Sequence, residues 1–260
     1  MPFRVMSFNV RMVNDRDGGN SWQDRASLNV RVIRDAAPDL IGFQELQREH
    51  LDVYLEHLPG YEHVLGPGVS TPVNQEHPAI FWNPARFELL TSGGFYLSPT
   101  PERWSRGWDS ACPRGATWAR FRAAGDEVVF VNTHLDHDGE VARIEGSRLI
   151  VERVEQMGDS RAPTVITGDF NAPPLTPTQR VYLLAGFRDA CAGLQEASFH
   201  GFKGEARRRA EPSAGRIDWI LTRDGARSLR VLEAGLVTDA EPPLYPSDHY
   251  PVVADLVLDG

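Results

Sequence analysis

The sequence predicts an α/β fold made of two similar halves, each with its own β-sheet. Two stretches of the chain follow one plan: an apolar strand with a polar residue near its end, a long helix, and a second strand that leads into an acidic residue. The spacing also agrees, with 36 positions from Asn9 to Glu45 and 35 from His134 to Asp169. Each unit would bury one face of its sheet under helices, so the two sheets would pack on each other. A chance agreement between common α/β spacings is the alternative.

The first unit begins close to the amino terminus. Residues 3–10 are mostly apolar and predict a buried strand, and residues 40–43 predict a second one. Between them, residues 24–37 predict a helix that ends before Pro38, because proline cannot continue a helix. One face of this helix carries apolar residues at helical spacing: Ala26, Val30 and Ile33.

The second unit repeats this pattern in the middle of the chain. Residues 128–134 predict a strand, residues 140–157 a helix, and residues 164–167 a second strand. The apolar stripe predicted for this helix consists of Val141, Ile144, Val151 and Val154. Further strands are predicted at residues 61–65, 79–82, 87–90, 117–123, 217–221, 231–237 and 252–258. No change in composition marks a linker, so we expect a single domain over residues 1–260.

The composition is typical of a folded protein with an acidic balance of charge. Of the 260 residues, 41% are hydrophobic, and 27 basic residues face 36 acidic ones, which gives a formal net charge of −9. This balance argues against a nucleic-acid coat protein or a polybasic membrane binder, whose affinity comes from lysine and arginine. It does not exclude an enzyme that reaches a phosphate through a bound metal ion.

The cysteines and the apolar runs exclude further classes. Cys112 and Cys191 are too few for a disulfide-rich scaffold or a cysteine-based zinc site, so we expect reduced thiols. The first residues are too polar for a signal peptide, and no apolar run approaches the ~18 residues of a membrane span. We therefore expect a cytoplasmic protein without a membrane span, and the sequence indicates no obligate protein partner.

Six short polar clusters interrupt the apolar strands. They lie at Asn9 and at residues 44–45, 132–134, 168–171, 216–219 and 247–249. A buried carboxylate needs a partner or a metal ion, and residues at strand ends can converge on one edge of a sheet. The clusters are rich in oxygen donors and contain no thiolate. This donor set favours Mg²⁺, with Mn²⁺ as the alternative.

Each cluster taken alone has an ordinary explanation. Glu45 by itself is more typical of a surface acid, and Asp169 can equally belong to a turn. Asp248 can cap a turn, and His249 can be a structural histidine. The functional interpretation depends on the clusters occurring together and in this order.

In this order the clusters resemble the motifs of the endonuclease/exonuclease/phosphatase superfamily, also called deoxyribonuclease I-like. The matching segments are Ser-Phe-Asn-Val at 7–10, Phe-Gln-Glu at 43–45, Asn-Thr-His-Leu at 132–135, Gly-Asp-Phe-Asn at 168–171, Arg-Ile-Asp-Trp at 216–219 and Ser-Asp-His-Tyr-Pro-Val at 247–252. The resemblance covers essentially the whole chain. It implies a four-layered α/β/β/α sandwich, in which two packed mixed sheets are flanked by helices and the active site lies at one end of the sheets.

The resemblance also implies roles for the matching residues. Glu45 would be the main Mg²⁺ ligand, with Asn9 beside it and Asp248 close to the metal. Asp169 would orient or deprotonate the attacking water, and Asn171 would hold that residue and the phosphate. Such roles make chemical sense, because a bound Mg²⁺ neutralises charge on a phosphate and an aspartate can accept a proton from water.

The histidines complete the implied site. His249 would contact the scissile phosphate, and Asp218 would orient its ring. His134 matches the branch of the superfamily that has histidine here rather than tyrosine, which includes deoxyribonuclease I and neutral sphingomyelinases. Glu76 is placed to orient His134. Spacing alone does not decide which residue is the general base and which is the general acid.

A competing zinc motif overlaps the third cluster. The segment His-Leu-Asp-His-Asp-Gly at 134–139 resembles part of the His-x-His-x-Asp-His-x-Gly signature of metallo-β-lactamase-like hydrolases. The first histidine of that signature falls at position 132, which is Asn132, and the other clusters have no place in that fold. We therefore expect Asp136 and His137 at the mouth of the site or at the start of the following helix.

Substrate contacts are expected from loops around the site. Residues 98–118 interleave arginine with tryptophan, which could stack a base and pair a phosphate, or could simply pin their own loop. Arg114 is the first candidate for a phosphate contact, and Trp108 and Asn132 are further substrate-binding candidates.

Two other segments are candidates for the border of the site. Trp22 and Arg25 open the first helix and could border the cleft, with a structural salt bridge as the equal alternative. Another loop contains Phe-His-Gly-Phe at 199–202 and three arginines at 207–209. An arginine run of this kind is most often a solvated patch.

The sequence thus predicts a Mg²⁺-dependent phosphoesterase that cleaves a P–O bond by in-line attack of water. A phosphodiester is the favoured substrate, and a nucleic acid is one candidate. A small, lipid or sugar phosphoester is the alternative, because the chain is compact and lacks a basic surface. A catalytically inactive binding module on the same fold would require the loss of Glu45, Asp169 or His249, and all three are present.

Overall fold

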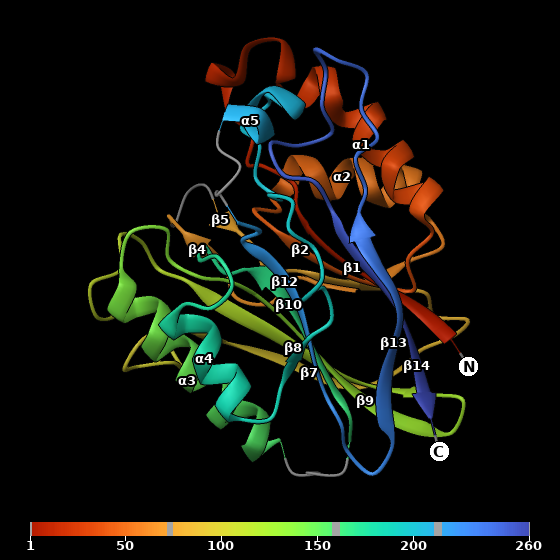
Figure 1. Cartoon of the computed structure of the whole chain (residues 1–260), viewed down its shortest axis with the longest axis vertical. Helices are drawn as coiled ribbons and strands as arrows, with labels where there is room; N and C mark the ends of the chain where they lie inside the picture. Colours follow the sequence, from red (N-terminus) through yellow and green to blue (C-terminus); the bar gives the residue numbers. More distant parts are fainter. Residues whose placement is uncertain (1, 72–74, 158–161, 211–214, 260) are drawn as a thin grey trace.

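Two six-stranded β-sheets pack face to face and carry helices on their outer faces (Figure 1). This computed structural model describes residues 2–71, 75–157, 162–210 and 215–259. The first sheet has the order β13 (Ser228–Leu236), β14 (Val252–Asp259), β1 (Pro2–Asn9), β2 (Leu40–Gln44), β6 (Ile80–Trp82) and β3 (Glu62–Val64). The second sheet has the order β7 (Glu88–Tyr96), β8 (Gly115–Ala123), β9 (Asp126–His134), β10 (Thr164–Asp169), β12 (Asp218–Arg223) and β11 (Arg188–Asp189). Two short strands, β4 (Val69–Ser70) and β5 (Gln75–Glu76), form a separate ribbon.

The two sheets are built on the same plan, as the repeated sequence pattern predicts. A parallel pair lies at the centre of each, β1 with β2 and β9 with β10. A long antiparallel hairpin borders the first strand of each pair, β13–β14 in one sheet and β7–β8 in the other. Two antiparallel strands complete the other side, β6 and β3 or β12 and β11. The predicted repeat is confirmed, and it extends to all six strand positions.

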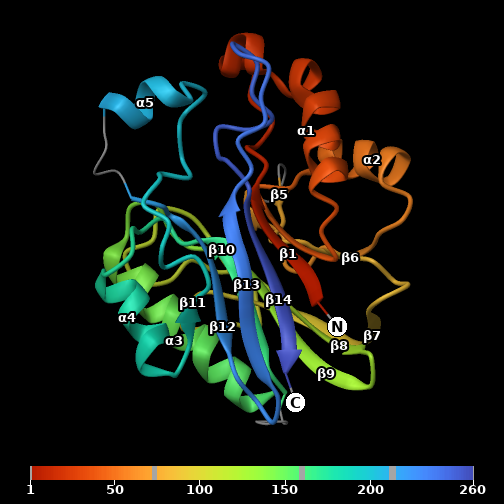
Figure 2. The ribbon, with the colours of Figure 1, turned by 45° about the vertical axis from the view of Figure 1, so that its right-hand side comes forward.

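The helices cover the two outer faces of the sandwich (Figure 2). The helices α1 (Trp22–Ala36) and α2 (Arg48–His57) lie on the side of the first sheet, and α3 (Glu140–Gln156) and α4 (Pro177–Leu184) lie on the side of the second. A short 3₁₀ helix, η1 (Asp15–Asn20), precedes α1. One apolar core lies under each helix pair, and a third lies between the sheets. The four-layered α/β/β/α sandwich is therefore confirmed.

The buried face of α3 includes Val154 of the predicted stripe but otherwise differs from it. Val141 is 50% exposed. The buried positions of the helix are Ala142, Gly146, Ser147, Ile150 and Val154. Three of these five residues are small, so the helix can pack close to the sheet. The prediction considered only large apolar residues and therefore chose a neighbouring face of the helix. In α1 the prediction was better, because Val30 and Ile33 are both buried.

Several elements were missed or shortened in the sequence prediction. The helix α2 buries His50, Leu51 and Tyr54, and α4 buries Thr178, Gln179 and Tyr182. Polar residues occupy part of each buried face, which weakens the apolar periodicity. The strand β7 runs to Tyr96 although it contains a Gly-Gly pair, because Trp118 packs closely over Gly93 from the neighbouring strand. A further short helix, α5 (Glu205–Ala210), also went unpredicted. Within the described ranges, no helix combines the length and the apolar character needed to cross a membrane.

Candidate active site

The polar residues predicted from the sequence gather where the central strands of both sheets end. Asn9 and Gln44 are the last residues of β1 and β2 and are paired in register. His134 and Asp169 are the last residues of β9 and β10 and are paired in the same way. Asp218 is the first residue of the antiparallel strand β12 and lies opposite Asp169 on its other side. Side chains from both sheets therefore meet at one end of the sandwich.

Asp169 is buried at the centre of this cluster. Its Oδ2 accepts a hydrogen bond from Asn9 Nδ2 at 3.0 Å, which links the two sheets. Its Oδ1 accepts a hydrogen bond from the backbone amide of Asn171 at 2.9 Å. Two imidazoles approach the same Oδ2, with His134 Nε2 at 3.5 Å and His249 Nε2 at 3.7 Å. A carboxylate in this position can hold a water molecule or accept a proton from it.

A buried ion pair holds His249 in place. His249 Nδ1 donates a hydrogen bond to Asp218 Oδ2 at 2.9 Å, and both side chains are buried. This bond orients the ring so that Nε2 faces Asp169. The other oxygen, Asp218 Oδ1, is buried and has no hydrogen-bond partner among the residues that the structure describes. The negative charge of Asp218 is therefore compensated mainly by the imidazole.

Glu45 lies on the other side of Asn9 and is half-buried. Asn9 Nδ2 also donates to Glu45 Oε1 at 3.0 Å, and the Met12 amide donates to Oε2 at 2.7 Å. Glu45 has a φ of 60°, a left-handed conformation that costs free energy in a non-glycine residue and is found at functional sites. Asp248 is close enough for its pKa to respond to Glu45, and Arg11 Nε lies 3.8 Å from Asp248 Oδ2. The three residues predicted to surround a metal thus lie together.

The crowding of carboxylates shifts several pKa values. Burial and the neighbouring Asp218 raise the pKa of Asp169 to about 7. Burial also raises the pKa of Asp248, and the charge of Glu45 adds to the rise. Burial alone would lower the pKa of His249, but Asp218 and the other carboxylates outweigh it and raise the pKa to about 10. The site therefore places a protonated imidazole beside a carboxyl group that titrates near neutral pH.

His134 is held by Asn171 and is neutral. Asn171 Nδ2 lies 3.1 Å from His134 Nε2 and donates to the Leu135 carbonyl at 3.0 Å. Because an amide nitrogen donates, His134 Nε2 accepts, and this network assigns the ring proton to Nδ1. Burial, assisted by the charge of Arg114, lowers the pKa of His134 well below its ordinary value. Glu76 is buried in β5, and its link to His134 stays a prediction.

Arg114 is buried close to these imidazoles. Its Nη2 donates to His137 Nδ1 at 3.0 Å, and its Nε lies 3.6 Å from Asp136 Oδ2. The two contacts fix the guanidinium group, and its charge acts on His134. Arg114 thus places a positive charge beside the cluster, and its predicted contact with a phosphate stays a prediction.

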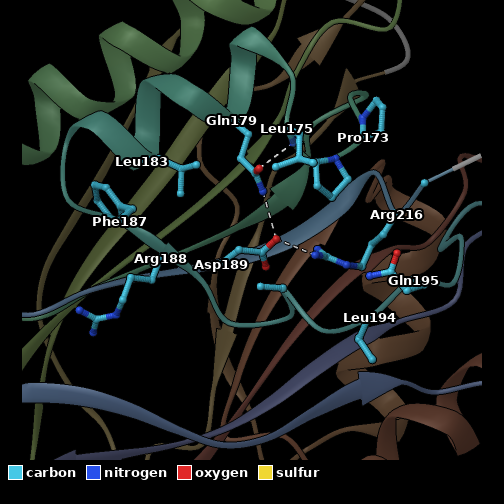
Figure 3. Close-up of a pocket in the computed structure, with 13 residues that line it drawn as sticks. Pro173, Leu175, Gln179, Leu183, Phe187, Arg188, Asp189, Leu194, Gln195 and Arg216 are labelled. Carbon is cyan, nitrogen blue, oxygen red and sulfur yellow. Dashed lines mark hydrogen bonds and ion pairs between the residues drawn. The ribbon is translucent and has the colours of Figure 1, made fainter.

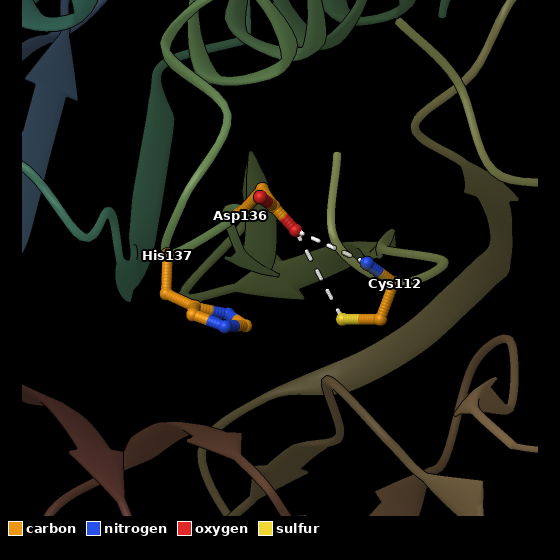
Figure 4. Close-up of side chains that lie close together, drawn as sticks. All are labelled: Cys112, Asp136 and His137. Carbon is orange, nitrogen blue, oxygen red and sulfur yellow. Dashed lines mark hydrogen bonds between the residues drawn. The ribbon is translucent and has the colours of Figure 1, made fainter. Parts of the chain in front are cut away.

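Two residues of the segment that resembles a zinc motif, Asp136 and His137, lie near Cys112, and potential ligand atoms of these three residues lie within 4.8 Å of one another (Figure 4). The oxygens of Asp136 already accept hydrogen bonds from the backbone amides of Ala111, Cys112, Asp138 and Gly139. Burial also raises the pKa of the Cys112 thiol, whereas a zinc ligand must be a thiolate. We assign no metal to this group. It ties the loop that precedes β8 to the start of α3, which agrees with the position expected for Asp136 and His137.

Two of the candidate substrate-binding residues lie away from the cluster. Asn132 is fully buried between the sheets, where Nδ2 donates to Phe43 O at 2.7 Å and to Ala79 O at 2.9 Å. It has no exposed atom to offer a substrate, and its hydrogen bonds join the two sheets. Trp108 is 38% exposed and borders a hollow formed with the outer part of α3. None of the residues around Asp169 lines that hollow.

Arg25 is fully buried, so it does not border the cleft. Its partners are backbone carbonyl groups rather than the carboxylate of a salt bridge. Its guanidinium donates to the backbone carbonyls of Val10, Arg11, Asn20 and Pro246 at distances of 2.6 to 3.1 Å. It also lies 5.0 Å from the ring centroid of Trp22, which is itself buried. Arg25 thereby joins the end of β1 to the segment that carries Asp248 and His249.

A separate cavity of about 540 Å³ has a largely apolar wall (Figure 3). The wall includes Pro173, Leu175, Phe187 and Leu194. Arg216 also lines it, where Nη2 pairs with Asp189 Oδ2 at 2.6 Å and Nη1 donates to the Asp218 carbonyl at 2.8 Å. The arginine of the Arg-Ile-Asp-Trp motif thus supports the backbone of Asp218. None of the site residues predicted from the sequence lines this cavity.

Some residues that hold the site were given no role in the sequence prediction, although Ser247 lies in one of its six clusters. Ser247 Oγ donates to the Asn9 carbonyl at 2.7 Å, and Ser198 Oγ accepts from the amides of Ile217 and Asp218 at 3.1 and 3.2 Å. Arg11 also lies at the site, beside Asp248. A serine in a turn has no chemical signature of its own, whereas Arg11 could have been suspected because it follows Asn9 by two positions.

Comparison with known proteins places these features in a family. A sequence model of the Endonuclease/Exonuclease/phosphatase family matches residues 6–249. The crystal structure of an endonuclease/exonuclease/phosphatase from Bacteroides vulgatus is 30% identical, covers 100% of both chains and superposes with a TM-score of 0.90. A mannosyl-6-phosphatase from Bacteroides thetaiotaomicron is also 30% identical, covers 98% of this chain and 99% of its own, and gives a TM-score of 0.88.

Curated relatives match a shorter part of the chain. An uncharacterised protein, L388, of Acanthamoeba polyphaga mimivirus is 26% identical over 159 residues, which is 58% of this chain and 59% of that protein. The aligned part is therefore less than two thirds of this relative. The solved structures, in contrast, match this chain along its whole length.

Proposed function

The chain belongs to the endonuclease/exonuclease/phosphatase family, and from this premise we propose that it hydrolyses a phosphodiester with the help of a divalent cation. Members of the family are phosphoric ester hydrolases. The observation that carries the proposal is the position of Asp169, which accepts hydrogen bonds from Asn9 and Asn171 and has two imidazole nitrogens at 3.5 and 3.7 Å. A buried carboxyl group with such neighbours is suited to orient and deprotonate water.

Glu45 and Asp248, with Asn9 beside them, are suited to hold the cation. The donors are oxygens, and the raised pKa of Asp248 together with the unpartnered Asp218 Oδ1 indicates an excess of negative charge that a cation would offset. Asp169, Asp218 and His249 also bring ligand atoms within 4.8 Å of one another. His249 already donates Nδ1 to Asp218, however, and its raised pKa means that a metal ion would have to displace a proton from this ring, which favours the oxygen ligands. We therefore propose Mg²⁺, with Mn²⁺ as the alternative, on the Glu45 side.

A bound divalent cation supplies positive charge that stabilises the phosphoryl oxygens during the reaction. The residues of the chain do the rest. Asp169 accepts a proton from the attacking water as the P–O bond to the leaving group breaks, and the leaving oxygen takes up a proton from solvent. The Asn171 amide keeps the carboxyl group of Asp169 in place. His249 donates a hydrogen bond through Nε2 to a phosphate oxygen, while Asp218 holds Nδ1. Arg114 contributes positive charge from the other side of the cluster.

A sugar phosphate monoester is the second candidate substrate. It is favoured by the 30% identity with the mannosyl-6-phosphatase, which extends over nearly the whole of both chains.

We further propose a cytoplasmic location, which agrees with two free cysteines. The two substrate classes are distinguished by comparing the rates of hydrolysis of bis-p-nitrophenyl phosphate, a phosphodiester, and mannose 6-phosphate, a phosphomonoester. Cleavage of a nucleic acid should weaken as salt is added, because several phosphates must be neutralised, whereas a small ester should show little such dependence.

The decisive experiment is hydrolysis of bis-p-nitrophenyl phosphate in Mg²⁺ by the wild type and by Asp169→Asn. We expect the variant to lose at least a hundredfold in kcat, because a neutral amide cannot accept the proton. Asp138→Asn is the matched control, since Asp138 is 74% exposed and lies outside the cluster. Full activity in Asp169→Asn would contradict the proposed role of this residue, and hydrolysis that persists in EDTA would contradict the metal.

A further inference from the structure

A short segment, Ser198 to Gly201, pairs with the backbone that carries His249. The Tyr250 amide donates to Ser198 O at 2.8 Å, and the His200 amide donates to Asp248 O at 2.8 Å. These two bonds flank an antiparallel pair formed by Phe199 and His249. In a pair of this kind the two residues lie close together, and their side chains point to the same face. Phe199 therefore stands beside His249 on the face that carries the catalytic cluster.

The burial of the segment agrees with this orientation. Ser198 and His200 point to the opposite side and are fully buried, whereas Phe199 is only half-buried. The centroids of the Phe199 and His249 rings are 4.9 Å apart. Phe199 thus extends the surface of the site next to the imidazole that is proposed to meet the phosphate.

Arg207 of α5 continues this row. Its guanidinium carbon lies 4.5 Å from the centroid of the Phe199 ring, and the residue is half-buried. Gly201 lies beside this contact, where its φ of 57° is a backbone conformation that favours glycine. Imidazole, phenyl and guanidinium groups therefore lie in sequence, leading outward from the cluster.

We propose that Phe199 and Arg207 form a subsite for a second phosphate group of the substrate, separated from the scissile phosphate by a ring such as a sugar. The proposal rests on the proposed function for the position of the scissile phosphate at His249. The spacings of 4.9 Å from His249 to Phe199 and 4.5 Å from Phe199 to Arg207 place the guanidinium group about one ring beyond the imidazole, so two phosphates bound at these groups would be separated by about one ring. Arginine is suited to the outer position, because its planar fork of donors matches a phosphate.

The charge of the neighbourhood supports this assignment. Glu45, Asp169, Asp218 and Asp248 make the cluster acidic, and the whole chain carries a formal charge of −9. A substrate with two phosphates needs positive charge at its outer end as well as at the scissile group. Arg207 supplies that charge on the side of His249, whereas Arg114 lies on the side of His134. The subsite would thus favour doubly phosphorylated ligands over singly phosphorylated ones.

The test measures binding, so that it does not depend on turnover. In the Asp169→Asn background and with Mg²⁺ present, titration calorimetry compares adenosine 3′,5′-bisphosphate with adenosine 5′-monophosphate. We expect the bisphosphate to bind about tenfold more tightly, because one further charge-assisted contact is made. Arg207→Gln should remove this preference and leave monophosphate binding unchanged. Arg207→Lys, which keeps the charge without the fork, should retain part of it.

Arg223→Gln is the matched control, because Arg223 also lies over a phenyl ring, that of Phe187 at 4.6 Å, outside the cluster. This variant should keep the full preference for the bisphosphate. Equal affinities of the two nucleotides for the Asp169→Asn protein, or a preference that survives in Arg207→Gln, would overturn the subsite. A loss of monophosphate binding in Arg207→Gln would indicate a structural role instead. The absence of hydrolysis in the wild type would count against the proposed function alone, since the binding comparison stands without it.

Discussion

Replacing Asn132 with alanine separates a structural role from a role in substrate binding. Its side chain has four hydrogen-bond partners: Phe43 O, Ala79 O, Gln44 Nε2 and Thr167 Oγ1. Each such bond contributes about 1 kcal/mol net to stability. Gln44 and Thr167 retain other acceptors after the substitution, so the loss should not exceed that of the four bonds themselves. We therefore expect the free energy of unfolding to fall by about 3–4 kcal/mol.

Urea denaturation followed by tryptophan fluorescence measures this change. The midpoint should fall while the slope m stays constant, because the surface exposed on unfolding is nearly the same. The kcat and KM of the folded variant should stay within about threefold of the wild type, since Asn132 has no exposed atom. Asn171→Ala should behave in the opposite way, with reduced kcat and a small change in stability. An unchanged midpoint with a raised KM for Asn132→Ala would refute this reasoning.

Three further predictions concern the ion pair of Asp218 and His249, the binding of Mg²⁺, and the stability of the fold at low pH. Asp218→Asn should lower kcat at least a hundredfold in steady-state assays, because His249 loses its partner at 2.9 Å; a loss below threefold would contradict the assigned role. Millimolar Mg²⁺ should raise the melting temperature of the wild type but not of Glu45→Gln, and an equal rise in both would place the cation elsewhere. Burial tends to raise the pKa of Asp136, but backbone amides outweigh it and hold the pKa below its ordinary value. Asp136 thus stabilises the fold above about pH 4 and loses this effect as the pH falls through its folded-state pKa. In urea unfolding, Asp136→Asn should therefore be less stable than the wild type at pH 7, and a gap that does not narrow towards pH 3 would rule this out.

The main layers of the fold could be predicted because they follow from a repeated apolar pattern. The strand, helix and strand of each unit have enough large apolar residues to show their period, and the polar residues at strand ends interrupt that pattern visibly. Asn9, Glu45, His134 and Asp169 could be identified for this reason. The buried face of α3 could not, because Gly146 and Ser147 fit against the sheet by being small rather than apolar.

The finer organisation of the site depends on contacts between residues distant in the sequence. Asn132 and His134 are separated by two positions, yet one lies between the sheets and the other at their end. Both were candidates from the same motif, and only the register of β9 against its neighbours distinguishes them. The pairing of Phe199 with His249 could not be predicted either, because nothing in the sequence of either segment indicates that the two residues are neighbours.

The position of β1 in its sheet has a consequence for how the protein is made. This strand begins at residue 2, yet one of its two neighbours is β14, which ends at residue 259. A chain emerging from the ribosome therefore exposes one side of β1 until β14 has been translated, and closure over such a distance in sequence is slow. Asp248 and His249 directly precede β14 in the sequence, so they reach their positions in the site only when β14 pairs with β1. The nascent polypeptide should thus stay inactive until the β13–β14 hairpin docks, and chaperones that shield unpaired strand edges should act on it before that moment.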